Sequence, residues 1–196
     1  MRLCFVGDSL VNGTGDPDCL GWSGRICAAA NRAGHDLTYY NLGIRRDTSA
    51  DVLARWEREV GCRLPADFDG RVVFSFGTND CTVENGRPRV AFDDSLANAK
   101  AILARAIERY PTLMIGPPPT CDPDRNRTVA RLSRAYERVC RALGVSYLEV
   151  FSALEAGPSW LREAAANDGA HPRAGGYTEL AALVDAWSGW RDWLDD

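Results

Sequence analysis

The sequence predicts an α/β fold in which helices cover a parallel sheet, and two observations lead to this prediction. Short apolar runs alternate with longer segments whose apolar residues recur at helical spacing, the pattern of successive βαβ units. Polar segments follow the first three runs, at the strand ends where open α/β sheets bind ligands. The 196 residues contain no linker or internal repeat and are expected to form one domain over residues 1–196.

Five apolar runs predict the strands. They cover residues 3–6, 37–41, 72–76, 113–115 and 146–150. A five-stranded parallel sheet in the flavodoxin-like order 2-1-3-4-5 would place the second and third strands beside the first. The loops that follow these three strands would then converge at one edge of the sheet.

Segments of helical period predict the helices between the strands. They cover residues 21–33, 48–60, 96–110, 129–143 and 174–187. Thr48 or Ser49 is a suitable N-cap for the second of them, because a hydroxyl can accept a hydrogen bond from the first turn.

The tryptophans have two interpretations each. Trp187, Trp190 and Trp193 are three residues apart, which places them along one side of a helix, and core packing is favoured over a dimer contact or a lipid-facing patch. Trp22 either lines an acyl-binding site or packs in the core. Residues 14–22 are expected to form a mobile rim.

Composition excludes several classes of function. A net charge of −4 and a pI near 5.3 disfavour nucleic acid, whose phosphates need a basic face. No apolar segment approaches the length of a membrane span, so stable membrane insertion is not expected, and no signal peptide is recognisable. Seven cysteines without a C-x-x-C pair predict neither disulfides nor a zinc site, and they favour the cytoplasm. No cofactor or metal is expected.

The groups that serine-based acyl transfer requires are all present. Ser9 lies in Gly-Asp-Ser-Leu directly after the first apolar run, and Asp168 and His171 are three positions apart near the last helix. The other histidine, His35, lies in a turn before the second strand, at the opposite end of the sheet. His171 is therefore the candidate base, and Asp168 is the candidate for orienting it.

Four short blocks occur in a specific order: G-D-S-L at Ser9, N-x-G at Gly43, G-x-N-D at Asn79 and D-x-x-H-P at His171. In this combination the chain resembles the GDSL family of esterases and lipases, in its SGNH hydrolase branch. The resemblance implies a three-layer α/β/α hydrolase in which Ser9 attacks an acyl carbonyl, His171 moves the proton and Asp168 orients His171. It also implies an oxyanion hole formed by the backbone N–H groups of Ser9 and Gly43 and the side-chain amide of Asn79.

Two further carboxylates and two arginines lie close to these blocks. Asp8 is expected to bond local backbone N–H groups and hold the serine turn, and Asp80 to brace the Asn79 loop or an adjacent turn, with a solvated surface role as the alternative for both. The family often has a second glycine after N-x-G, where this chain has Arg45 and Arg46. These arginines either face solvent or lie at the pocket mouth, where they would favour an anionic or polar substrate.

The sequence thus predicts a serine esterase that hydrolyses small or medium carboxylic acyl esters through an acyl-enzyme on Ser9. An acyltransferase or thioesterase with the same triad is an alternative, because both reactions use the same residues. A non-catalytic, flavodoxin-like ligand-binding protein is another. The expected partner is a small-molecule acyl ester, and formation of a homo-oligomer is left open.

Overall fold

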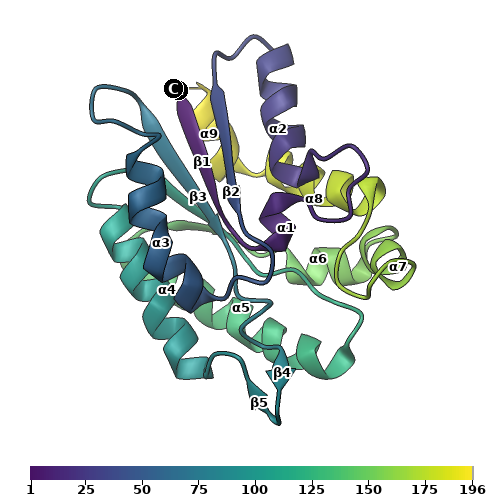
Figure 1. Ribbon diagram of the computed structural model, residues 1–196. Coiled ribbons are helices and arrows are strands. Elements are labelled where there is room, and N and C mark those ends of the chain that lie inside the picture. Colours follow the sequence, from purple (N-terminus) through teal and green to yellow (C-terminus); the bar gives the residue numbers. More distant parts are fainter. Residues whose placement is uncertain (196) are drawn as a thin grey trace.

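A five-stranded parallel sheet forms the centre of the molecule in the computed structural model, which describes residues 1–195 (Figure 1). Its strands are β1 (Arg2–Gly7), β2 (Thr38–Gly43), β3 (Gly70–Ser75), β6 (Thr112–Ile115) and β7 (Ser146–Leu148). The order β2-β1-β3-β6-β7 confirms the predicted order, with bounds within two residues of those expected. A short antiparallel hairpin of β4 (Val83–Glu84) and β5 (Arg87–Pro88) was not predicted, because it lacks an apolar run.

Helices cover both faces of this sheet and produce three layers (Figure 1). The helices are α1 (Ser9–Asn12), α2 (Gly21–Arg32), α3 (Ser49–Gly61), α4 (Phe92–Ala106), α5 (Pro123–Leu143), α6 (Phe151–Ala156), α7 (Trp160–Ala165), α8 (Ala174–Ala186) and α9 (Ser188–Asp195). Helices α3, α4 and α5 pack on one face, while α2, α8 and α9 pack on the other. None of the helices within residues 1–195 has the length and apolarity needed to cross a membrane.

The central strand β1 contributes to both core clusters, because alternate side chains of a strand point to opposite faces. Cys4 and Val6 pack toward α3, α4 and α5, whereas Leu3 and Phe5 pack toward α2, α8 and α9. All four are fully buried. Trp22 of α2 is also fully buried and makes an edge-to-face contact with Phe5 at 5.5 Å between ring centroids. Trp22 therefore belongs to the core.

The start of α3 follows its sequence signal. Thr48 is the N-cap, and its hydroxyl accepts a hydrogen bond from the Asp51 N–H, while the Asp51 carboxylate accepts one from the Thr48 N–H at 2.9 Å. This reciprocal capping box stabilises a helix terminus by satisfying two otherwise unpaired donors. It also fixes the chain that connects β2 to α3, where Arg45 and Arg46 lie.

The three C-terminal tryptophans do not lie on one continuous helix. Helix α8 ends at Ala186, Trp187 has an extended backbone, and α9 begins at Ser188. Trp190 is fully buried in the core, and Trp187 and Trp193 are half-buried around the same cluster. Core packing is the correct interpretation, although the helical register inferred across residue 187 was wrong.

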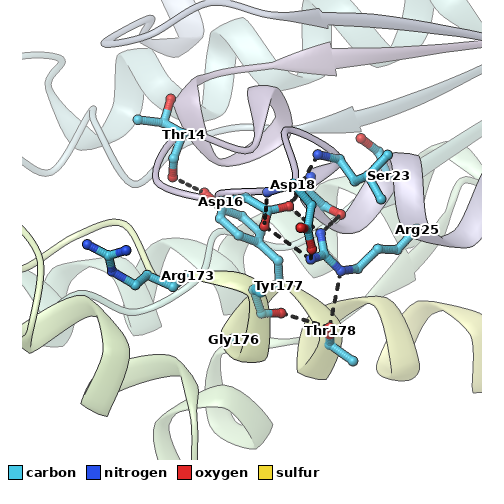
Figure 2. A network of polar contacts seen from close by, with 12 residues as sticks. Thr14, Asp16, Asp18, Ser23, Arg25, Arg173, Gly176, Tyr177 and Thr178 are labelled. Atoms are coloured by element: carbon cyan, nitrogen blue, oxygen red, sulfur yellow. Dashed lines mark hydrogen bonds and ion pairs between the residues drawn. The ribbon is translucent and has the colours of Figure 1, made fainter.

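The loop between α1 and α2 is anchored by polar contacts to neighbouring helices (Figure 2). Asp16 forms an ion pair with Arg25 of α2, and the Nε of Arg25 donates a hydrogen bond to the Thr178 hydroxyl of α8 at 3.1 Å. The Tyr177 hydroxyl donates to the Thr14 carbonyl at 2.7 Å. These contacts attach the expected rim to two helices.

Candidate active site

Ser9 is presented by a sharp transition from strand to helix. Strand β1 ends at Gly7, where a Cβ would collide with the Ser75 carbonyl of β3, so a side chain does not fit there. Asp8 is the N-cap of α1, and its Oδ1 accepts a hydrogen bond from the Leu10 N–H at 2.9 Å. Ser9 is the first residue of the helix, and among residues 1–195 its backbone N–H has no hydrogen-bond partner.

A continuous hydrogen-bond chain joins Ser9 to two residues from the other end of the sequence. Ser9 Oγ lies 2.7 Å from His171 Nε2, and His171 Nδ1 lies 2.7 Å from Asp168 Oδ2. Both distances match strong hydrogen bonds. The fold thus brings together a hydroxyl, an imidazole and a carboxylate that are up to 162 positions apart in the chain.

Asp168 is held as a carboxylate. Partial burial by itself would raise its pKa, but hydrogen bonds from the backbone and ring of His171 and from the Ala170 N–H lower the pKa to about 2. An ionised carboxylate beside Nδ1 favours the tautomer that carries its proton there. Nε2 is then free to accept the proton of the Ser9 hydroxyl.

The segment that carries His171 is fixed by α7, an element that the sequence did not predict. Glu163 Oε2 accepts hydrogen bonds from the N–H groups of Arg173 and Gly176 at 3.0 and 2.8 Å, at the start of α8. The Asn167 amide donates to the His171 carbonyl at 3.0 Å. Sequence reasoning missed Glu163 because helix α7, which carries it, is too short to show a clear apolar period, and it found no signal for Asn167 in the turn that follows.

Asn79 follows β3 and lies next to the Ser9 turn. Its Nδ2 donates to the Asp47 carbonyl at 2.9 Å and approaches Asp8 Oδ2 at 3.4 Å. Asp80 points away from this amide, because its Oδ1 accepts the Ser49 N–H at 2.7 Å and ties the β3 loop to the start of α3. Asp8 and Asp80 are almost fully buried, which excludes a solvated surface role for these two side chains.

Two buried carboxylates near the Ser9 turn, those of Asp8 and Asp80, have raised pKa values. Burial raises the pKa of Asp8 to about 7; the Leu10 N–H opposes this shift, and the negative charges of Asp80 and Asp47 reinforce it. Burial also raises the pKa of Asp80. Asp8 therefore changes its protonation state close to neutral pH, directly beside both Ser9 and Asn79.

The contacts of Gly43 do not agree with the oxyanion role predicted for it. Its N–H donates to the Asn41 side chain at 2.9 Å, and a Cβ at this position would collide with the Asn12 backbone of α1. Glycine is needed there because α1 packs closely on the end of β2. Arg46 also lines the cavity, and it has a left-handed φ of 72° and a backbone N–H without a partner among residues 1–195.

A cavity of about 250 Å³ opens above these groups. Ser9, Asn79 and His171 line it. The rest of its wall is strongly cationic and includes Arg45, Arg46, Arg89 and Arg125, with Glu84 as the acidic member. Both arginines discussed from the sequence therefore line the cavity, and two more arginines join them.

Comparison with known proteins agrees with this geometry. The sequence profile of the GDSL-like Lipase/Acylhydrolase family matches residues 5–178. The chain belongs to this family. As a GDSL-like acylhydrolase it is a hydrolase that acts on esters, and this membership excludes the flavodoxin-like binding protein considered above. No curated protein sequence matches the chain.

Solved structures share the fold of this GDSL-like hydrolase. The lipase/acylhydrolase from Enterococcus faecalis is 23% identical with a TM-score of 0.78, and the match covers 97% of this chain and 96% of that one. Axe2, an acetylxylan esterase from Geobacillus stearothermophilus, is 19% identical with a TM-score of 0.75 over 96% and 95%. LAE5, an alpha/beta hydrolase enzyme from the metagenome of Lake Arreo in Spain, is 20% identical with a TM-score of 0.78 over 96% and 95%.

Proposed function

We propose that this GDSL-like hydrolase is a serine esterase that cleaves small or medium carboxylic acyl esters through an acyl-enzyme on Ser9. The observation that carries the proposal is the unbroken hydrogen-bond chain from Ser9 through His171 to Asp168. The cavity of about 250 Å³ supports a small acyl group. The fold shared with an acetylxylan esterase also supports a small acyl group as the substrate's acyl part.

The reaction proceeds in two balanced steps. Ser9 Oγ attacks the acyl carbonyl carbon while His171 Nε2 takes the hydroxyl proton, and the resulting imidazolium is stabilised by the Asp168 carboxylate. The bond between the carbonyl carbon and the alcohol oxygen then breaks, and His171 returns the proton to the leaving alcohol. Water attacks the acyl-enzyme with the help of His171, which releases the carboxylic acid and restores the Ser9 hydroxyl.

The negative charge on the tetrahedral intermediate needs hydrogen-bond donors. The Ser9 N–H and the Asn79 amide are proposed as two of them, as the family pattern implies. In place of Gly43, the backbone N–H of Arg46 is proposed as the third, because Arg46 lines the same cavity as Ser9 and this N–H has no partner among residues 1–195. Donors of this kind lower the barrier because they act on charge that develops only during the reaction.

The pattern of catalytic mutants in a structural relative supports the role of Asp168 and His171. Catalytic mutants of Axe2 replace a serine, an aspartate and a histidine, and that aspartate precedes the histidine by three positions. The same spacing separates Asp168 from His171 here. A shared spacing on the same fold is consistent with a shared function.

Substitution of Ser9 tests the proposal directly. Ser9→Ala is expected to reduce turnover of 4-nitrophenyl acetate by about 10⁴-fold or more, since a serine nucleophile has no substitute in the site. Intact-mass measurement should find one phosphonate adduct on the wild-type protein and none on Ser9→Ala. Ser152→Ala, which removes an exposed hydroxyl from α6, is the matched control and should keep both activity and adduct. Wild-type rates in folded Ser9→Ala would contradict the proposal.

A further inference from the structure

We propose that the ester hydrolysed at this site carries a carboxylate, and that Arg125 binds this carboxylate. The inference rests on the proposed esterase function and names its substrate class. Arg125 belongs to the first turn of α5 and lines the same cavity as Ser9 and His171. It is thus a specificity-determining residue and takes no part in bond cleavage.

Arg125 differs from the other arginines of the cavity in having no partner. Its Nε is buried without a hydrogen-bond acceptor, and its guanidinium forms no ion pair among residues 1–195. Asp122 is close enough for the charge of Arg125 to act on its carboxylate, but Asp122 Oδ1 caps α5 by accepting the N–H groups of Asp124 and Arg125. The side-chain donors of Arg125 are left for a ligand.

The other three arginines of the cavity form ion pairs with carboxylates of the protein. Arg46 and Arg89 share the single carboxylate of Glu84, at 2.8 and 3.7 Å, and Arg45 lies 3.6 Å from Asp168. With His171 neutral, the cavity lining has a formal charge of +3, in a chain whose net charge is −4. The positive charge is therefore a property of this site and not of the whole surface.

A partly buried guanidinium without acceptors favours an anionic ligand. Arginine stays protonated at all physiological pH values, so it cannot relieve the cost of burial by losing its charge. A carboxylate matches the planar guanidinium geometrically and forms charge-assisted hydrogen bonds with it. An ester that brings its own carboxylate would satisfy Arg125, whereas a neutral ester would leave it unpaired.

Two pairs of esters test the preference and locate the carboxylate. In the first pair the leaving alcohol carries the charge, as 4-acetoxybenzoate against its methyl ester. In the second the acyl group carries it, as mono-4-nitrophenyl adipate against its methyl ester. After subtraction of spontaneous hydrolysis, kcat/KM of the wild-type protein is expected to be about tenfold higher for the charged member of at least one pair, the size of one charge-assisted hydrogen bond.

Charge-matched variants assign the preference to Arg125. Arg125→Gln should lower kcat/KM about tenfold for the charged ester, mainly through KM, and change the neutral ester less than about twofold. Arg125→Lys should recover part of the loss. Arg127→Gln removes the same charge from the same helix, but Arg127 is exposed and lies outside the Ser9 cavity, so both esters should behave as with the wild type. Thermal unfolding of each variant verifies that it is folded.

Protection from labelling gives a readout that does not depend on turnover. Benzoate, but not benzamide, should slow the reaction of Ser9 with a neutral phosphonate, and Arg125→Gln should abolish this protection. Equal rates for the charged and neutral esters, with no protection by benzoate, would overturn the carboxylate inference while Ser9 labelling and neutral-ester turnover still support the esterase. No labelling and no turnover of any ester would overturn both.

Discussion

Asp8 contacts both the helix turn that carries Ser9 and the loop that carries Asn79. One of its carboxylate oxygens caps the helix that begins with Ser9, and the other faces the Asn79 amide. Its burial is nearly complete, and its pKa is raised to about 7. The folded protein therefore keeps a proton on Asp8 at pH values where the unfolded chain, with an ordinary pKa of 3.8, has lost it.

This difference makes the stability contribution of Asp8 depend on pH. Because the folded state binds more protons between the two pKa values, the contribution is fully present below pH 3.8 and decreases as the pH rises through about 7. Asp8→Asn keeps an N-cap oxygen and removes the titration. From about pH 5 to about pH 8, the unfolding free energy of the variant relative to wild type should rise by about 2–3 kcal/mol.

Urea unfolding of both proteins at several pH values measures this change. A difference between the two proteins that stays constant with pH would show that Asp8 does not titrate in this range. Activity of Asp8→Asn on a neutral ester, measured on the same samples, reports how much the orientation of Asn79 depends on the Asp8 charge.

Single residues also show where sequence reasoning stops. Ser9, Asp168 and His171 were named from motifs because a triad needs these residue types, and the structure brings their side chains together. The oxyanion role of Gly43 stays a prediction, because a motif shows that a glycine is required but not which atoms need the space, and here the Asn12 backbone lies against it. Arg125 has no sequence signal at all, because an arginine in a polar helical turn normally faces solvent.

At the scale of elements, the loop before α2 depends on one buried ion pair. The Asp16 side chain is completely buried, and besides Arg25 it accepts the Gly21 N–H at 2.8 Å, whereas Asp18 binds the same arginine from a side chain that is 60% exposed. Burial opposes ionisation of Asp16, but the hydrogen bonds from Arg25 and the backbone outweigh it and lower its pKa.

Removing the buried partner should cost much more than removing the exposed one. Asp16→Ala leaves Arg25 without its buried acceptor and should lower the unfolding free energy by about 3 kcal/mol. Asp18→Ala, the matched control, should lower it by less than about 1 kcal/mol because solvent screens that pair. Urea denaturation compares the two variants, and equal losses would contradict the anchoring role of Asp16.

Elements were predicted to different extents for a physical reason. The three inner strands, β1, β3 and β6, are mostly buried and apolar, so they stand out in the sequence, whereas the edge strands β2 and β7 are only partly buried. The order of the strands follows from the common parallel topology. Helices α6 and α7 have only six residues each, too few for a helical period to be recognised. The break at Trp187 leaves the spacing of the tryptophans unchanged, so spacing could not reveal it.

For the whole molecule, α9 completes the second helical layer. Trp190 of α9 is fully buried, and its ring centroid lies 6.3 Å from that of Phe5 in the central strand β1. Helix α9 therefore packs against the same core as β1. Arg71 of β3 also donates a hydrogen bond to the Trp193 carbonyl at 3.2 Å. These contacts make α9 part of the core structure.

Truncation of the Trp190 side chain should destabilise the whole molecule. Trp190→Ala is expected to lower the unfolding free energy by about 3–5 kcal/mol, because it removes a large buried ring and leaves a cavity. Trp187→Ala, which removes a half-buried ring beside it, should cost less. Thermal unfolding, followed by tryptophan fluorescence and by circular dichroism, compares the two variants. A smaller loss of stability for Trp190→Ala than for Trp187→Ala would contradict this prediction.

The separation of 162 positions between Ser9 and His171 also matters during protein synthesis. Translation adds Ser9 long before His171, so during that interval the nascent chain lacks the imidazole that bonds the Ser9 hydroxyl in the folded protein. A ribosome-bound or truncated chain that ends before residue 171 lacks the proposed base for Ser9. Hydrolytic activity should therefore appear only in chains that extend beyond residue 171.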